Sequence, residues 1–201
     1  PVKIPAFGRL IPEDRSYEQK YSFTSLPFAT PVTVERGLAR PPLVDWYNQK
    51  DTSACTAFAA SWQMSMYNRP PINPHDGKRV YNKYDAPWLY YHTRLNDGDP
   101  RNDPPLDIGS FVWAAFWVLN HMGHVRVIGK DVSDAPDMRD GITGYYWCST
   151  VDQMRTAFGL GRIAVVGTNW SELMMTPFEL NGEWWIQPGG SVLGGHAYVL
   201  R

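Results

Sequence analysis

Residues 49–59 read Q-K-D-T-S-A-C-T-A-F-A, and this short stretch decides how the rest of the chain is interpreted. Large apolar side chains follow the cysteine at fourth-residue spacing: Phe58, Trp62 and Met66. That spacing predicts a helix from about Cys55 to Asn68, capped by Thr52 or Ser53. A cysteine in the first turn of a helix lies beside free backbone N–H groups and the positive end of the helix dipole, which favour the thiolate over the thiol. The segment therefore predicts a reactive cysteine.

A thiolate nucleophile needs an imidazole within hydrogen-bond reach and donors that stabilise an oxyanion. The candidate imidazole is His196, which follows Gly194 and Gly195 at the start of a predicted strand. The two glycines leave room for a substrate backbone and permit a tight turn. Gln49, six residues before the cysteine, is a candidate oxyanion donor together with the backbone N–H of Cys55. From the residues alone, a buried structural cysteine, an ordinary glycine turn and a loop glutamine explain the same features.

The composition is that of one folded domain. The chain has 201 residues, of which 43% are hydrophobic and 14% aromatic, and its formal net charge is −1. Basic and acidic residues are interspersed, so the sequence indicates no nucleic-acid or membrane partner. The longest apolar run, 111–119, is too short to cross a bilayer, and the first residues lack the pattern of a signal peptide. We therefore expect a virion-borne or cytoplasmic protein rather than one that is secreted independently.

The two cysteines and the closest histidine pair offer little for metal binding. Cys55 and Cys148 are too few for a disulfide framework; they form one bridge or remain two free thiols. Cys148 has no basic neighbour in sequence and is interpreted as a buried structural thiol. His121 and His124 are expected near the C-terminal end of a helix rather than at a metal. No metal site and no cofactor are predicted.

The order of the expected elements favours an α+β fold. Residues 1–45 are rich in proline and predict an extended N-terminal arm, followed by one domain over 46–201. Further helices are expected at 88–95, 110–122 and 151–158, and strands at 162–167, 182–186 and 196–200. The adjacent Trp184 and Trp185 are expected to be one core residue and one partly covered residue, with stacking on a ligand as the less favoured reading.

The segment 49–59 resembles the nucleophile segment of the papain-like cysteine peptidases, in particular their bacterial and phage branch, and L-G-G-H-A-Y-V-L at 193–200 resembles the family's histidine strand. Segments 8–17, 89–94, 107–111 and 161–167 match the family in the expected order. The resemblance implies a two-lobe fold, with a helical left lobe around the helix that begins at the cysteine and a β-rich right lobe.

By this resemblance Cys55 is the nucleophile, His196 the general acid and base, and Gln49 the oxyanion donor. The implied reaction is hydrolysis of a peptide or amide bond through a thioester, with a peptide or protein as substrate. The sequence does not separate a peptidase from a transpeptidase. It departs from the family in the residues just before the cysteine, where Lys50 stands at a position of a turn that commonly contains glycine.

The family's third catalytic residue, an Asn or Asp after the histidine, is absent from the five residues that follow His196. Asn169 and Asn181 lie upstream and have no motif to recommend them. We expect the domain to continue beyond Arg201; the alternative is an incomplete triad and a weak or inactive site. A second function of another class is a structural component of a phage tail tip that keeps the fold, with the N-terminal arm as its assembly contact.

Overall fold

The structure is a computed structural model, which describes residues 47–67, 82–102, 106–128, 131–132 and 139–200. The expected N-terminal arm over 1–45 lies outside the described residues. The helices are α2 (Cys55–Tyr67), α3 (Ala86–Asn96), α4 (Val112–His121) and α5 (Val151–Gly159), with short 3-10 turns η2 (Pro100–Asn102) and η4 (Glu172–Met175). The strands are β1 (Lys83–Tyr84), β2 (His124–Ile128), β3 (Asp131–Val132), β4 (Arg139–Asp140), β5 (Ala164–Ser171), β6 (Phe178–Leu180), β7 (Glu183–Trp185) and β8 (Val192–Leu200).

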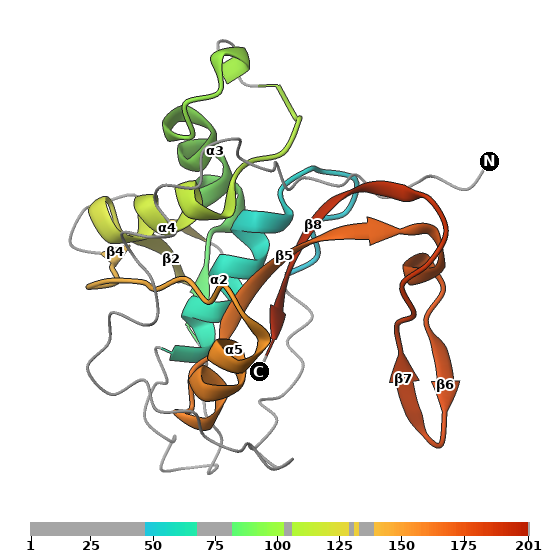
Figure 1. The fold of residues 1–201 in the computed structure, drawn as a ribbon. Coiled ribbons are helices and arrows are strands. Elements are labelled where there is room, and N and C mark those ends of the chain that lie inside the picture. Colours follow the sequence, from blue (N-terminus) through green and yellow to red (C-terminus); the bar gives the residue numbers. More distant parts are fainter. Residues whose placement is uncertain (1–46, 68–81, 103–105, 129–130, 133–138, 201) are drawn as a thin grey trace.

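Helix α2 runs through the middle of the described part, between helices α3 and α4 and the β5–β8 ribbon (Figure 1). Most of its side chains are small, and ten of its thirteen residues are buried. A helix that is apolar or small on all sides is typical of a central, enclosed position. The helix that begins at Cys55 thus lies where both other groups of elements contact it.

Two clusters of buried side chains surround α2. The larger cluster joins α2, α3 and α4: Ala57, Ala60, Met64, Tyr84, Leu89, Ala115, Val118 and Leu119. The smaller cluster joins the start of α2 to the start of α4 and to β8: Cys55, Ala59, Val112 and Ala197. Removal of such apolar surface from water is the main stabilising contribution in a folded domain. The second cluster fixes the beginning of α2 against the strand that carries His196.

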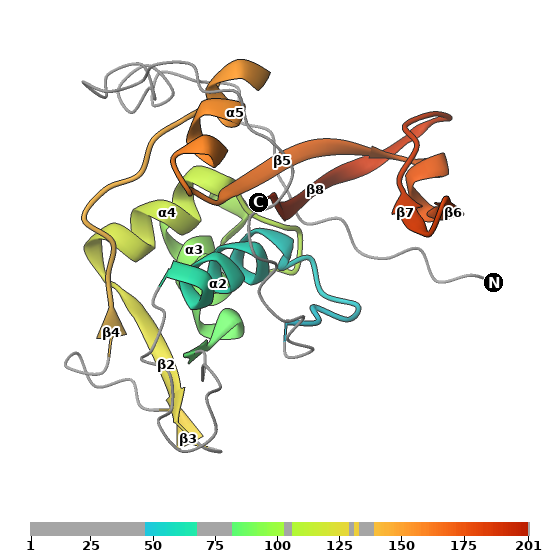
Figure 2. The same cartoon turned by 90° about the horizontal axis from the view of Figure 1, so that it is seen from below.

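A small sheet lies on the far side of the helices from the ribbon (Figure 2). Strand β2 pairs antiparallel with β1, β3 and β4. Its first residue, His124, is fully buried, and its ring stacks on that of Tyr84 at a centroid distance of 4.9 Å. This differs from the expectation of a helix end at His121 and His124. Only His121 lies in the last turn of α4, because Gly123 takes a positive φ of 73° and turns the chain into β2.

Strands β5 and β8 form a long antiparallel ribbon that leads away from the helices (Figures 1 and 2). Thr168 pairs with His196, and Trp170 pairs with Gly194. The register then shifts, so that Ser171 pairs with Val192 and Leu193 is the extra residue of a β-bulge. Strand β8 therefore begins before the two glycines, which lie inside a strand and not in a tight turn. The expected turn at Gly194 and Gly195 is corrected accordingly.

Beyond the bulge, β6 and β7 form a second hairpin, here called the outer hairpin (residues 178–186). Its connection is Asn181-Gly182, with φ of 54° and 77°. Two successive positive φ angles are typical of the tight turn whose twist matches that of the flanking strands, and Asn-Gly is its favoured sequence. The outer hairpin projects from the end of the ribbon farthest from the helices (Figure 1).

The arrangement is α+β, as expected, and the predicted helices form with small changes in their ends. Strand β5 ends four residues later than predicted, and β8 begins four residues earlier. The 182–186 strand is β7, whereas its partner β6 and the small β1–β4 sheet were not predicted.

Both tryptophans of β7 are exposed, Trp184 by 73% and Trp185 by 44%. The expectation of one core and one partly covered tryptophan is wrong, because no further layer covers either face of the outer hairpin in the described part of the chain. No described helix is long and apolar enough to span a bilayer.

Candidate active site

Cys55 is the first residue of α2, and only 1% of it is exposed. The first intrahelical hydrogen bond runs from the N–H of Phe58 to the carbonyl of Ala54, at 3.0 Å. The N–H groups of the first turn have no carbonyl partner within their own helix, and they carry the positive end of its dipole. The structure therefore puts Cys55 at the helix position that the sequence predicted, and the ionisation of its thiol stays a prediction.

A tight loop places Gln49 beside the start of α2. The carbonyl of Gln49 accepts hydrogen bonds from the N–H of Thr52 at 3.1 Å and from its hydroxyl at 2.6 Å. The Gln49 side-chain amide in turn donates to the carbonyl of Thr52 at 2.9 Å. Lys50 takes a φ of 51°, the left-handed region in which glycine is the usual residue. The loop therefore takes a glycine-like conformation at a position that holds lysine.

Thr52 and Ser53 do not cap α2. The Thr52 hydroxyl is bound to Gln49, and the N–H of Ser53 donates to Asp107 Oδ1 at 2.8 Å. The same Asp107 oxygen accepts from the hydroxyl of Tyr90 at 2.9 Å. Burial, together with this bond to Asp107, raises the pKa of Tyr90, so the phenol stays protonated and donates. The expected cap is therefore wrong: Asp107, 54 positions after Ser53 in the chain, binds the segment just before the helix.

The segment that follows Asp107 is fixed to the helices by further buried polar contacts. The hydroxyls of Thr56 and Ser110 are in hydrogen-bond contact, and Arg94 Nη1 donates to the carbonyl of Gly109 at 2.6 Å. Arg94 is a buried cation, with 1% exposure. Buried polar groups of this kind stabilise one arrangement because each lost partner leaves a desolvated group. The start of α2, where Cys55 lies, is thus joined to neighbouring segments by several polar contacts.

His196 lies on β8, half-buried, facing the same side of the ribbon as Thr168 directly across from it. The indole ring of Trp170 meets the imidazole edge to face, with centroids 4.9 Å apart. Burial lowers the pKa of His196. The Thr168 hydroxyl is buried and has no hydrogen-bond partner among the described residues. Directly opposed side chains in an antiparallel pair lie within contact distance, so this hydroxyl is available to the imidazole.

Gln49, Cys55 and His196 line one pocket of about 310 Å³. The rest of its wall is mainly apolar and aromatic: Tyr47, Phe58, Ala59, Trp62, Ala197, Tyr198 and Val199. Three residues separated by up to 147 positions in the chain are brought to one cavity by the contact of α2 with β8. The structure thus brings the three residues that the sequence singled out to one cavity.

The other candidates stand apart from this pocket. Gly194 and Gly195 lie on β8 beside His196 and are not among the residues that line it. Asn169 pairs with Gly195 and is exposed on the opposite face of the ribbon from His196, because successive strand residues alternate between faces. Asn181 is in the turn of the outer hairpin. Neither asparagine is placed to hold the His196 imidazole.

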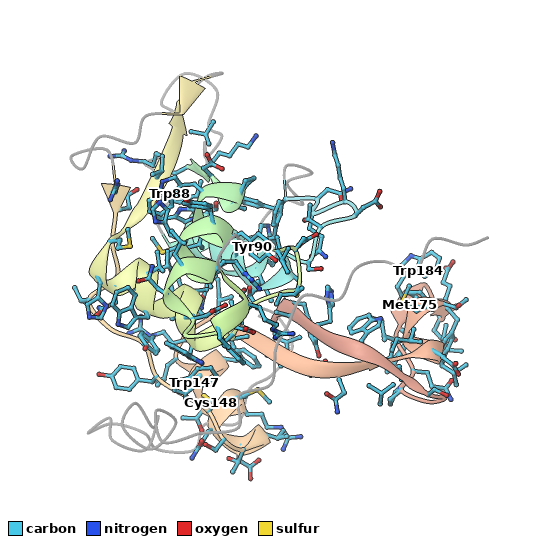
Figure 3. The ribbon with its side chains drawn as sticks, turned by 90° about the horizontal axis from the view of Figure 1, so that it is seen from above. Trp88, Tyr90, Trp147, Cys148, Met175 and Trp184 are labelled. Carbon is cyan, nitrogen blue, oxygen red and sulfur yellow. The ribbon has the colours of Figure 1, made fainter. Side chains whose placement is uncertain are left out.

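The two cysteines are both free thiols, which settles the alternative left open by the sequence. Cys148 lies next to α5 (Figure 3) and is half-buried, less than expected. Burial raises the pKa of the Cys148 thiol, which disfavours its reactive thiolate form. Within the described residues no group of three or more His, Cys, Asp or Glu side chains is arranged to hold a metal ion.

Sequence reasoning missed Asp107, Thr168 and Trp170. Asp107 lies in the segment 107–111 that resembles the family, but no sequence pattern predicts its hydrogen bond to Ser53, 54 positions earlier in the chain. Thr168 and Trp170 lie past the predicted end of a strand at 167. Had that strand been extended by the alternation of residues, its pairing with the histidine strand would have placed both beside His196.

Comparison with known proteins gives a likeness of fold. No family model matches the chain, and no curated protein matches it. Among solved structures, the chain is similar to xylellain, a cysteine protease from Xylella fastidiosa, with a TM-score of 0.57 and 15% sequence identity. The superposition covers 97% of this chain and 78% of that one. At this identity the likeness concerns the fold, in agreement with the α+β arrangement around α2.

Proposed function

We propose that the chain is a papain-like cysteine peptidase that hydrolyses peptide or amide bonds through a thioester on Cys55. The observation that carries the proposal is the shared pocket of Gln49, Cys55 and His196, with the cysteine at the first residue of a central helix. The fold likeness to a cysteine protease supports it at the level of architecture. A mainly apolar and aromatic wall favours substrates with an apolar side chain near the cleaved bond.

In the proposed reaction, the Cys55 thiolate attacks the carbonyl carbon of the substrate, and the negative charge moves to the carbonyl oxygen. The Gln49 amide and the Cys55 N–H donate hydrogen bonds to that oxygen. The His196 imidazolium gives its proton to the leaving amine, and a thioester remains. Neutral His196 then takes a proton from water, the hydroxide attacks the thioester, and the acid and the free thiolate are released.

Burial opposes a positive charge on His196, so the imidazolium needs the thiolate beside it. Thr168 is the described residue best placed to fix the ring, because it faces His196 across the ribbon with a buried hydroxyl. We assign it a positioning role in the proposed reaction. Trp170 would limit rotation of the ring from its edge.

The test is the rate of alkylation of each cysteine by iodoacetamide near neutral pH, followed by mass spectrometry of the peptides. We expect Cys55 to react at least about tenfold faster than Cys148, whose pKa is raised by burial. His196→Ala should slow the labelling of Cys55 and leave that of Cys148 unchanged. Equal slow labelling of both thiols would contradict an activated Cys55.

Hydrolysis of a fluorogenic peptide library separates activation of the thiol from catalysis. Gln49→Ala is expected to lower kcat about 100-fold while the labelling rate stays the same, because alkylation forms no oxyanion. Cys55→Ser should abolish turnover, and Cys148→Ser is the matched control that retains it. Rapid labelling without hydrolysis of any peptide would instead favour a structural component with an inactive site, such as the tail-tip role considered from the sequence.

A further inference from the structure

The outer hairpin presents large apolar side chains to solvent on both faces. Its exposed residues are Phe178 (41%), Leu180 (50%), Trp184 (73%), Trp185 (44%) and Ile186 (50%). Figure 3 shows Trp184 at the outer end of the ribbon, remote from α3 and α5. A contiguous exposed apolar surface of this kind is unusual on a protein that works alone and is typical of a binding surface.

The pairing register divides the outer hairpin into two chemically different faces. Phe178 pairs with Trp185, so these two side chains share one face with Leu180. Glu179 pairs with Trp184 on the other face, where an exposed carboxylate lies next to an exposed indole. A lysine or arginine side chain fits this second face, since it would meet both an aromatic surface and a negative charge.

The charge of this region has one sign. From residue 163 to residue 200 the chain contains three glutamates and no aspartate, lysine or arginine, whereas the whole chain has 19 basic and 20 acidic residues. A second copy of the hairpin would bring like charges together. Complementarity therefore favours a partner whose apolar residues are flanked by positive charges.

The outer hairpin is held firmly enough to present this surface. The Glu172 carboxylate accepts from the N–H of Ser191 at 3.0 Å, and the N–H of Leu173 donates to the carbonyl of Gly189 at 3.1 Å. The Ser171 hydroxyl accepts from the N–H of Gly189 at 2.9 Å. These bonds join η4 to the start of β8 and so fix the base of the outer hairpin on the ribbon. A preformed surface loses less conformational entropy when it binds.

We propose that the outer hairpin is a docking surface for a polypeptide segment in which lysine or arginine alternates with apolar side chains. The apolar face of Phe178, Leu180 and Trp185 contacts the apolar side chains, and the pair Glu179–Trp184 holds a cationic one. The proposal concerns binding alone and does not depend on the activity of Cys55.

The test uses the full chain with Cys55→Ser, so that the probe is not cleaved. The probe is a synthetic peptide in which lysine and arginine alternate with leucine, and its matched control has glutamate at each basic position. Calorimetry is expected to show binding of the basic peptide and none of the acidic one. Trp184→Ala should weaken binding at least about tenfold, and Glu179→Gln about threefold, the latter effect fading at high salt.

Matched controls lie elsewhere on the surface. Tyr91→Ala removes an aromatic side chain that is 52% exposed on α3, and Asp152→Asn removes an exposed charge on α5; both should bind the basic peptide as before. Leu180→Ser supplies a second variant on the apolar face, and circular dichroism confirms that each variant is folded.

Three outcomes would overturn the proposal. The first is equal binding of the basic and acidic peptides, or undiminished binding by Trp184→Ala. The second is self-association of the unmodified chain in sedimentation that Trp184→Ala abolishes, which would assign the surface to a second copy. The third is quenching of tryptophan fluorescence by a soluble oligosaccharide that Trp184→Ala abolishes, together with no peptide binding, which would assign the surface to a carbohydrate.

Discussion

Helix α2 and the outer hairpin are built on opposite principles. Helix α2 buries small side chains on nearly every face, and hydrogen bonds join it and the loop before it to His124, Asp107 and Ser110. The outer hairpin exposes large aromatic side chains, and every residue of β6 is exposed. Small buried residues allow neighbouring elements to approach the helix closely and to contact it on many sides. Two strands without a covering layer contact only each other. Stability is therefore concentrated around α2, and recognition is left to the outer hairpin.

His196 stands between these two regions, because β8 starts at the outer hairpin and ends against α2. Cys55 belongs to a helix in which ten of thirteen residues are buried, and His196 belongs to a strand that is mostly half-buried. Variants that change only the surroundings of α2 or only the outer hairpin test whether these two regions differ in their contribution to stability.

The largest effect on stability is expected from acid, through His124. This histidine is fully buried, its Nε2 lies 2.7 Å from the Ser61 hydroxyl, and burial lowers its pKa to about 3. In the unfolded chain the pKa of this histidine is about 6.5. Between that pH and 3, the imidazole is therefore protonated in the unfolded state and neutral in the folded state. The contribution of this group to stability is complete above pH ~6.5 and is lost as the pH falls toward 3, by roughly 3 kcal/mol at pH ~4.5.

Urea unfolding at a series of pH values measures this loss. His124→Gln should flatten the fall of unfolding free energy between pH ~6.5 and ~4.5, although it lowers stability at neutral pH. His121→Gln, which changes an exposed histidine at the end of α4, should leave the fall as it is. If His124→Gln and the unmodified chain show the same pH dependence, the buried neutral imidazole is not its cause.

A smaller effect is expected from Asp107→Ala, which removes the acceptor shared by Ser53 and Tyr90. We expect a loss of about 1–2 kcal/mol in unfolding free energy, since both donors are only partly covered and water can replace the acceptor in part. Asp107→Asn keeps one oxygen and should lose less. The second readout is the labelling rate of Cys55, which falls if the start of α2 loosens; an unchanged rate would mean that Asp107 contributes stability alone.

The smallest global effect is expected from Gly190→Ala at the base of the outer hairpin. Gly190 has a φ of 76°, and a Cβ there would lie 2.5 Å from Glu172 Oε2, so the bond from Ser191 to that carboxylate is displaced. We expect about 1 kcal/mol or less in global stability, together with faster hydrogen exchange confined to residues 171–192.

Gly182→Ala is the matched control for this variant, because φ is 77° and nothing lies within 4 Å of the added Cβ. Gly182→Ala introduces the same backbone strain without a steric clash. Its faster hydrogen exchange should therefore stay within the Asn181-Gly182 turn. Exchange that spreads to Thr168 or His196 after Gly190→Ala would show that the ribbon and the outer hairpin are one cooperative unit.

The parts of the fold that the sequence predicted are those with local signals. The apolar spacing after Cys55 predicted α2, the β-branched run at 162–167 predicted the start of β5, and Thr150 caps α5 as expected, accepting from the N–H of Gln153. The shared pocket of Gln49, Cys55 and His196 agrees with their selection by resemblance, and their chemical roles remain predictions.

The missed parts depend on partners distant in the chain. The bond from Ser53 to Asp107 and the burial of His124 beside Ser61 join positions more than fifty residues apart, for which a single sequence carries no pattern. The outer hairpin is different, because Asn181-Gly182 is a strong local signal that went unused. The exposure of Trp184 and Trp185 could not be predicted from the sequence, because it depends on whether another layer of the fold covers the strands.

The β-bulge at Leu193 also has an evolutionary consequence. Because the extra residue absorbs a change of register between Trp170 and Ser171, side chains on either side of it are assigned to faces independently. A lineage can therefore replace the whole tip of the ribbon, by recombination or by insertion, while Thr168 and His196 keep facing each other. We expect sequence changes at that tip to leave the pocket of Gln49, Cys55 and His196 unaltered.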